Sequence, residues 1–211
     1  MKSGFGHAVI AFVTFSLFIT STFAQNILPN GSFDEVTAVY HDIHNSGLDN
    51  VTEWKGINSV DFYKNRLGKQ NYLGLTTGSL YPYEYAYVTL HSALVPHKKY
   101  RITLSIYSKT RKPPLSVLLI NGADSNAITQ FSIPELARSP ANTFIPVFIS
   151  RQRGWRSRWR YYLFEFQVRN EADIFIIGNC ARVKTKIPYC FIDDIKIEEV
   201  DGSKEKTMRA Q

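Results

Sequence analysis

The stretch Phe191-Ile192-Asp193-Asp194-Ile195-Lys196-Ile197 decides the fold, because it alternates like a strand that closes a β domain. The alternation places Asp193 on the same face as the apolar Phe191 and Ile195. A carboxylate that faces a core is costly unless it is paired or binds a metal ion. A second segment, Asn30-Gly31-Ser32-Phe33-Asp34-Glu35, brings two acids near the expected start of the mature chain. The two ends of the domain are therefore expected to meet, and one shared cation is a way to hold them.

The remainder of the chain has the signals of an all-β protein. Residues 84–94 and 100–107 alternate apolar and polar side chains, and Pro96-His97-Lys98-Lys99 between them has the composition of a turn. Further strands are expected at 115–120, 143–150, 161–169, 173–177 and 190–199. Many short strands without alternating helices predict an antiparallel sandwich or barrel. Residues 36–83 read mainly as loops, with Trp54 and Phe62 as core anchors.

Residues 1–24 have the organisation of a secretory signal peptide. Lys2 supplies the positive start, residues 8–19 are apolar, and Thr22-Phe23-Ala24 precede Gln25. The apolar stretch is short for a membrane span, and no second stretch of spanning length follows. We expect an exported protein of the periplasm, cell surface or extracellular space. Its single domain covers 25–200, with a disordered tail over 201–211 and no transmembrane segment in the mature chain.

The net charge of the chain indicates which partners to expect. The 211-residue chain has a formal net charge of +7, which favours acidic partners such as anionic glycans, lipopolysaccharide or an acidic protein. Nucleic acid is not an expected partner of an exported protein.

Export makes a disulfide between Cys180 and Cys190 the default interpretation, and this disulfide would connect the last two strands. A two-cysteine metal site lacks the C-x-x-C spacing and further ligands.

Aromatic and arginine residues gather in Arg151-Gln152-Arg153-Gly154-Trp155-Arg156-Ser157-Arg158-Trp159-Arg160-Tyr161-Tyr162. Aromatic rings stack on the C–H faces of sugars, and arginine pairs with carboxylate or sulfate groups. The candidate ligand-binding residues here are Trp155, Arg156, Arg158, Trp159 and Tyr161. An alternative stays open, in which a strand already begins here. In that case Trp155, Trp159, Tyr161 and Leu163 share one face as core, and Arg156, Arg158 and Arg160 form a solvated edge.

A second aromatic group has the spacing of a strand face. Its members, two residues apart, are Tyr81, Tyr83, Tyr85 and Tyr87. Half-exposed packing is expected for this group, with ligand contact at Tyr81 and Tyr83. Catalytic motifs are not found: there is no G-x-S-x-G elbow, phosphate loop or H-E-x-x-H.

Several segments, taken in order, resemble galactose-binding-like jelly-roll domains. The resemblance is closest to the carbohydrate-binding-module-like domain of envelope proteins of gliding Gram-negative bacteria, which is often fused to OmpA-type domains. The matching segments are residues 30–35, Trp54, Val60-Asp61-Phe62-Tyr63, Asn71-Tyr72-Leu73-Gly74-Leu75, residues 84–100, Ile176-Ile177-Gly178-Asn179 and residues 191–195. Together they cover 26–199. The resemblance implies an eight- or nine-stranded, non-catalytic jelly roll of the bacterial envelope. No OmpA-type domain follows here, and His97 stands where the family has Gly.

The resemblance also implies a structural calcium ion. Related modules hold calcium with an acid after the G-x-F motif and an Asp of the closing strand, which corresponds to Asp34 or Glu35 with Asp193 or Asp194. Calcium prefers such oxygen ligands, although solvated or hydrogen-bonded carboxylates are the alternative. The predicted function is a non-catalytic exported module that recognises carbohydrate, anionic glycans included. The alternative is a structural or protein-interaction component of an envelope assembly, whose partner would be an acidic envelope protein.

Overall fold

The computed structural model describes residues 25–37, 46–58, 60–66, 69–76, 83–108, 115–123, 128–129, 132–147, 158–180 and 189–200. The predicted signal peptide and C-terminal tail lie outside the described residues. Three predicted ligand-binding residues lie outside them as well: Tyr81, Trp155 and Arg156. Within the described ranges, no helix has the length and apolar character needed to cross a membrane.

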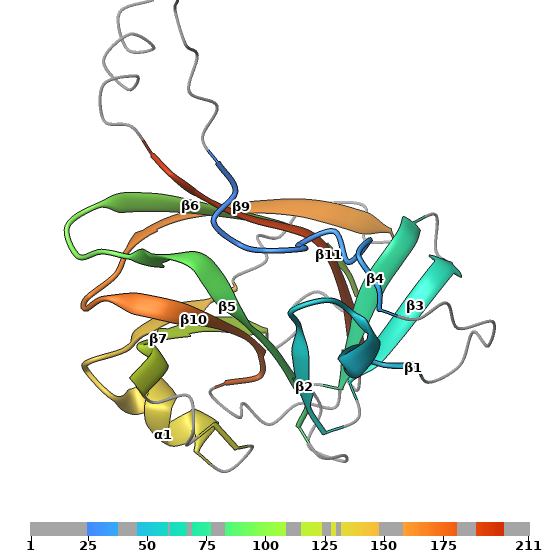
Figure 1. Ribbon diagram of the computed structural model, residues 1–211, viewed down its shortest axis with the longest axis horizontal. Helices are drawn as coiled ribbons and strands as arrows, with labels where there is room; N and C mark the ends of the chain where they lie inside the picture. The colour runs from blue at the N-terminus through green and yellow to red at the C-terminus, as the bar shows by residue number, and fades with distance from the viewer. Residues whose placement is uncertain are drawn as a thin grey trace, which may run out of the picture.

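Two antiparallel sheets build the described part of the chain (Figure 1). The strands of the first are β1 (Ser46–Gly47), β3 (Asp61–Arg66), β4 (Lys69–Thr76), β6 (Lys99–Tyr107), β9 (Trp159–Gln167) and β11 (Tyr189–Glu199). Those of the second are β2 (Lys55–Ile57), β5 (Tyr85–Leu94), β7 (Ser116–Ile120), β8 (Thr143–Pro146) and β10 (Ala172–Gly178). Two short helices accompany them, η1 (Leu48–Asn50) and α1 (Ile133–Arg138).

The path of the chain is that of a jelly roll. The six-stranded sheet has the order β1-β3-β4-β11-β6-β9, and the five-stranded sheet has the order β2-β5-β10-β7-β8. From β4 onward the strands pair from the outside inward: β4 with β11, β5 with β10, β6 with β9, and β7 with β8. Such nested antiparallel pairs describe one long hairpin wrapped into two sheets. The predicted fold, an antiparallel two-sheet jelly roll, is confirmed.

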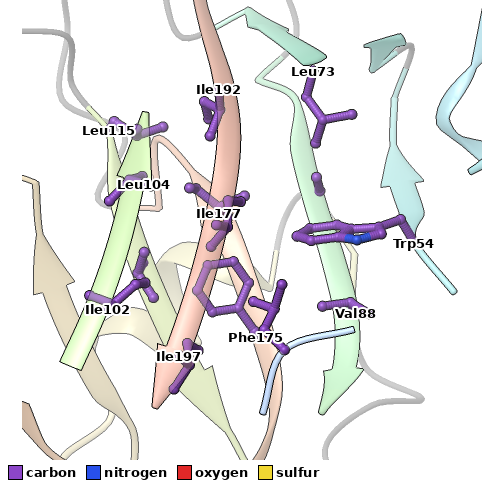
Figure 2. Close-up of a cluster of buried hydrophobic side chains, with 14 of the residues drawn as sticks. Trp54, Leu73, Val88, Ile102, Leu104, Leu115, Phe175, Ile177, Ile192 and Ile197 are labelled. Carbon is purple, nitrogen blue, oxygen red and sulfur yellow. The ribbon is translucent and has the colours of Figure 1, made fainter. Parts of the chain in front are cut away.

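The core lies between the two sheets, where alternate side chains of the facing strands meet. Figure 2 shows a part of it, formed by Trp54, Leu73, Val88, Ile102, Leu104, Leu115, Phe175, Ile177, Ile192 and Ile197. The ring of Trp54 meets Phe33 edge-on, with centroids 5.1 Å apart. Phe62, the other predicted anchor, belongs to the same core. A second cluster joins the outer face of the five-stranded sheet to α1, and comprises Tyr85, Leu118, Ile120, Ile133, Ile174, Ile176 and Cys180.

The closing strand β11 contains a bulge that its sequence pattern does not reveal. Its register against β6 shifts between Asp193 and Lys196, and Asp194 has a φ of 52°. Because a bulge adds a residue, side chains after it change face. Ile195 therefore points into the core, whereas Phe191 and Asp193 lie on the outer face. The prediction that all three share a face was wrong for this reason. Asp193 is nevertheless buried, and its Oδ1 accepts the Asp194 amide at 2.7 Å.

Backbone hydrogen bonds hold the first described residues against this bulged strand. The Ile27 amide donates to the Ile197 carbonyl at 2.7 Å, and the Ile195 amide donates to the Gly31 carbonyl at 2.9 Å. Gly31 approaches so closely that a Cβ there would overlap the Ile195 carbonyl oxygen. The predicted meeting of the two ends is confirmed, and the contacts that make it are main-chain ones.

We expect Gly31→Ala to destabilise the domain by about 3 kcal/mol, because the added methyl has no space beside the backbone of β11. Urea denaturation measures the loss. Gly56→Ala is the matched control, since its Cβ would meet Val60 only at 3.4 Å, and it should change stability much less. Equal effects of the two substitutions would contradict the close contact.

Cys180 and Cys190 are both free thiols, so the predicted disulfide is wrong. Cys180 belongs to the cluster on the outer face of the five-stranded sheet, whereas Cys190 belongs to the core between the sheets. A bridge needs Cβ atoms that approach each other, and side chains in separate clusters do not provide this. Burial raises the pKa of each thiol to about 12, and for Cys190 the charge of Glu84 adds to the effect.

Neither thiol should react with Ellman's reagent in the native protein, because burial and a raised pKa suppress the thiolate. Both should react after unfolding in guanidinium chloride without reductant. Spectrophotometric thiol counting gives the result directly. If no thiol reacts in the unfolded protein, a bridge has formed and the free-thiol arrangement is refuted.

Candidate functional site

The outer face of the six-stranded sheet carries aromatic rings that face away from the core. We name as the outer aromatic cluster the residues Tyr63, Tyr72, Tyr107, Trp159, Tyr189 and Phe191. Five strands contribute to it. The strand register sets Phe191 opposite Tyr107, and Tyr107 opposite Trp159, so these rings form one row across the sheet.

The rings fix one another in place. Tyr63 stacks on Tyr72 with centroids 5.3 Å apart and an interplanar angle of 11°. Trp159 meets Tyr72 edge-on at 5.3 Å and lies 5.8 Å from Tyr107. Stacked and edge-on contacts of this kind are the favoured geometries of aromatic pairs. The cluster is therefore an ordered layer rather than a set of independent side chains. Tyr72 and Tyr107 are buried within it, at 1% and 9% exposure, and the other four rings are partly exposed.

Gly74 provides the space in which two tyrosines converge. A Cβ there would lie 2.5 Å from the Tyr189 hydroxyl and 2.7 Å from the Tyr63 ring. The Tyr63 hydroxyl donates to Asp61 Oδ2 at 3.1 Å, and the Tyr189 hydroxyl donates to the same oxygen. Burial, followed by the bond to Asp61, raises the pKa of Tyr189 far above its usual value. The phenol therefore stays protonated and remains a donor.

A second carboxylate, Glu84, lies near the same end of the sheet. Its Oε2 accepts the Thr76 amide at 2.6 Å, and Thr76 is opposite Tyr189 in the register. Burial raises the pKa of Glu84 to about 7; the bond from Thr76 opposes this shift, and the charge of Asp61 adds to it. Glu84 consequently changes charge near neutral pH.

Only the last residues of the predicted aromatic–arginine segment, 158–162, are described, and the strand β9 contains those from Trp159 onward. Tyr161 is 65% exposed and Leu163 is 50% exposed, both on the face that Trp159 shares. The alternative in which these side chains are core is wrong, because the inward positions of β9 belong to Tyr162, Phe164 and Phe166. Arg158, just before the strand, is exposed.

Tyr83 lies apart from Trp159 and Tyr161, although the sequence predicted all three as ligand-binding residues. Tyr83 packs against the cluster on the outer face of the five-stranded sheet, together with buried Tyr85 and partly buried Tyr87. Trp159 and Tyr161 face away from the other sheet, so Tyr83 does not join them. Tyr63 and Tyr72 were missed. The sequence does contain a signal for them. Each is adjacent to a core residue, Tyr63 to Phe62 and Tyr72 to Leu73, so each is expected on the opposite face of its strand.

The four predicted calcium ligands lie on two segments, Asp34 and Glu35 near the first described residues and Asp193 and Asp194 on β11. Asp34 and Glu35 are exposed, and Asp34 Oδ1 accepts the Asn71 side-chain amide at 2.6 Å. Asp194 Oδ2 accepts the Ser105 hydroxyl at 3.1 Å. Among the residues that the structure describes, no three His, Cys, Asp or Glu side chains are grouped to hold a metal ion. One buried oxygen near Asp34, Oδ1 of Asn71, has no hydrogen-bond partner.

No family model and no curated protein match the sequence. Among solved structures, a putative sugar binding protein from Bacteroides thetaiotaomicron is similar at 11% identity and a TM-score of 0.43, covering 83% of this chain and 100% of that one. The CBM22-1 xylan-binding domain of Paenibacillus barcinonensis Xyn10C matches at 10% identity and a TM-score of 0.41, over 75% and 91% of the two chains. The enzymatically active domain of bacteriophage CBA120 tailspike protein 4 matches at 10% identity and a TM-score of 0.39; 83% of this chain spans 21% of that one.

Glu84→Gln should stabilise the protein at alkaline pH but not at acidic pH. The pKa of Glu84 is raised in the folded state from 4.5 to about 7, so the wild type loses stability as pH rises through this window. Glutamine keeps the acceptor for the Thr76 amide and carries no charge. We expect a gain of about 2 kcal/mol at pH 8 that vanishes near pH 4, measured by urea denaturation.

The control is Glu171→Gln, since Glu171 is exposed. A gain for Glu84→Gln that is the same at both pH values would show that burial of its charge is not the cause.

Proposed function

We propose that the protein is a non-catalytic, exported module that binds carbohydrate on the outer face of its six-stranded sheet. One observation carries the proposal: the partly exposed rings of the outer aromatic cluster, Trp159 among them, continue along β9 into Tyr161, which is 65% exposed. Aromatic surface that serves only folding is normally directed inward. Rings presented on a sheet offer the flat apolar surface on which the C–H faces of sugars stack.

A row of polar groups runs beside the aromatic row; Asp193 and Ser105 are its buried members and Tyr161 is its exposed one. The register sets Asp193 opposite Ser105, and Ser105 opposite Tyr161. Asp61, at the other margin, holds the hydroxyls of Tyr63 and Tyr189. A sugar ring needs both features, because its faces are apolar and its edges carry hydroxyl groups. A few fixed polar groups beside an apolar surface are typical of ligand sites.

The cluster is arranged before any ligand binds. Its rings restrain one another through edge-on and stacked contacts, and Gly74 lets two phenols share one carboxylate. Binding to such a surface costs less ordering entropy than binding to mobile side chains. The partly exposed carboxylate Asp61 favours a neutral sugar at the cluster itself. An anionic glycan would instead need the arginine segment, of which Arg158 is exposed.

Calcium belongs to the proposal as a stabilising ion. It would bind Asp34 or Glu35 together with Asp193 or Asp194, beside the bulge of β11. Supporting this, Asn71 connects to Asp34 and has a buried oxygen without a hydrogen-bond partner. Carboxylate and amide oxygens are ligands that calcium prefers. Its part would be to hold the N-terminal segment on the sheet, not to contact the sugar.

A second candidate function is a structural or interaction component of an envelope assembly. The observation that favours it is the long margin of β9, where Tyr161 and Leu163 are exposed. An acidic envelope protein is the expected partner, given the net charge of +7.

The test is a glycan-array screen of the purified protein with calcium and again with a chelator, followed by calorimetry on the best glycan. We expect selective, saturable binding, and an affinity about tenfold lower in Tyr161→Ala, because one stacking ring is lost. Chelation should lower thermal stability. Val95→Ala removes an exposed apolar side chain elsewhere and should bind normally.

A folded protein that gives no array signal would refute carbohydrate binding and favour the envelope-assembly function. Binding that Tyr161→Ala leaves unchanged would refute the assignment of the site to this face.

A further inference from the structure

Strand β9 is much longer than the other strands at the edges of the two sheets. The outermost strands β1, β2 and β8 have 2, 3 and 4 residues, whereas β9 has 9. Within the described ranges, β9 pairs with β6 on one side and with no strand on the other (Figure 1). A free strand margin presents a row of N–H and C=O groups to other chains, which is why soluble proteins keep such strands short.

The middle of β9 is apolar on both faces. Tyr161 and Leu163 project from the outer face at 65% and 50% exposure. On the inner face, Tyr162 and Phe164 stack with centroids 6.4 Å apart and are only partly buried against the core. A long margin of this composition favours association, because pairing would cover apolar groups on both faces at once.

The order of residues along β9 selects the direction of pairing. Arg158 and Arg160 lie at its start, and Phe164 and Phe166 lie toward its end. Parallel pairing of two copies would bring like-charged arginines together. Antiparallel pairing about Leu163 sets Arg160 opposite Phe166 of the partner subunit, and about Tyr162 it sets Arg160 opposite Phe164 of the partner subunit. Either register keeps the arginines of the two copies apart and gives an apolar centre. The strand is thus complementary to itself.

We propose that two copies of the chain pair antiparallel along β9 about a two-fold axis, which joins their six-stranded sheets into one. A two-fold axis perpendicular to the sheet keeps the outer faces of both copies on the same side. Tyr161 of each copy then lies near the junction, and the two outer aromatic clusters form one continuous surface. The partner copy in this way contributes to the surface on which ligand binding is proposed.

The experiment is analytical ultracentrifugation of the purified protein from low micromolar to sub-millimolar concentration, with its mass determined to establish processing. We expect a reversible monomer–dimer equilibrium. Leu163→Lys should raise the dimer dissociation constant at least about tenfold, because the two added charges then lie at the apolar centre, opposite each other in one register and diagonal to each other in the other. Thr89→Lys adds the same charge on an exposed position of β5 and should dimerise normally.

A wild type that is monomeric at every concentration would falsify the proposal, as would a folded Leu163→Lys that dimerises as tightly as the wild type. A cysteine scan gives an independent test. Cysteine is placed singly at positions 161, 162, 163 and 164, and oxidative cross-linking is measured. The native thiols are buried and should stay silent.

Antiparallel pairing predicts one cross-linking maximum, at the residue on the two-fold axis. A residue two positions from the axis on the same face is about 13 Å from the same residue of the partner subunit, which is too far to cross-link. Cross-linking at every position would indicate parallel pairing, and none at any position would indicate that β9 does not self-pair; both would overturn the proposal.

Discussion

The bulge in β11 is the constraint on which the other features of this protein depend. β11 lies in the middle of the six-stranded sheet, between β4 and β6, so the direction of its side chains organises both faces. The register shift at Asp193 lets Cys190 and Ile192 face the core before the bulge, and Ile195 and Ile197 after it. The same shift leaves room for the N-terminal segment, whose Gly31 carbonyl receives the Ile195 amide. Core closure and attachment of the chain's start thus follow from one irregularity.

The two faces of the six-stranded sheet have separate chemistry as a result. The inner face packs aliphatic and aromatic side chains into the core. The outer face carries aromatic rings that contact one another, with carboxylates and hydroxyls beside them. Gly74 supports this division, since any side chain there would displace Tyr63 or Tyr189 from Asp61. The outer face is therefore maintained by specific contacts that the core does not require. Such contacts are what the proposed ligand-binding surface would require.

The sequence predicted the strands and the all-β class well because alternation and turn composition are local signals; the jelly roll itself was implied by the resemblance of several segments to a known family. Even the turn at His97 was placed correctly, and its φ of 69° shows that the turn keeps the conformation a glycine would favour. The candidate site was predicted only in part. Trp159 and Tyr161 were identified, but Tyr63 and Tyr72 join them only through strand order, which no local pattern encodes. The bulge at Asp194 depends on the register of β11 against β6. The separation of Cys180 from Cys190 depends on which face of its sheet each side chain occupies. Composition determines neither.

The two free thiols have a consequence for how the chain acquires its structure. Because the described fold has no covalent crosslink, the redox potential of the surroundings does not enter its folding equilibrium. The same polypeptide reaches the same native state in a reducing cytosol and in an oxidising compartment, without help from disulfide-forming enzymes. A domain with this property folds independently of the redox state of the compartment that produces it.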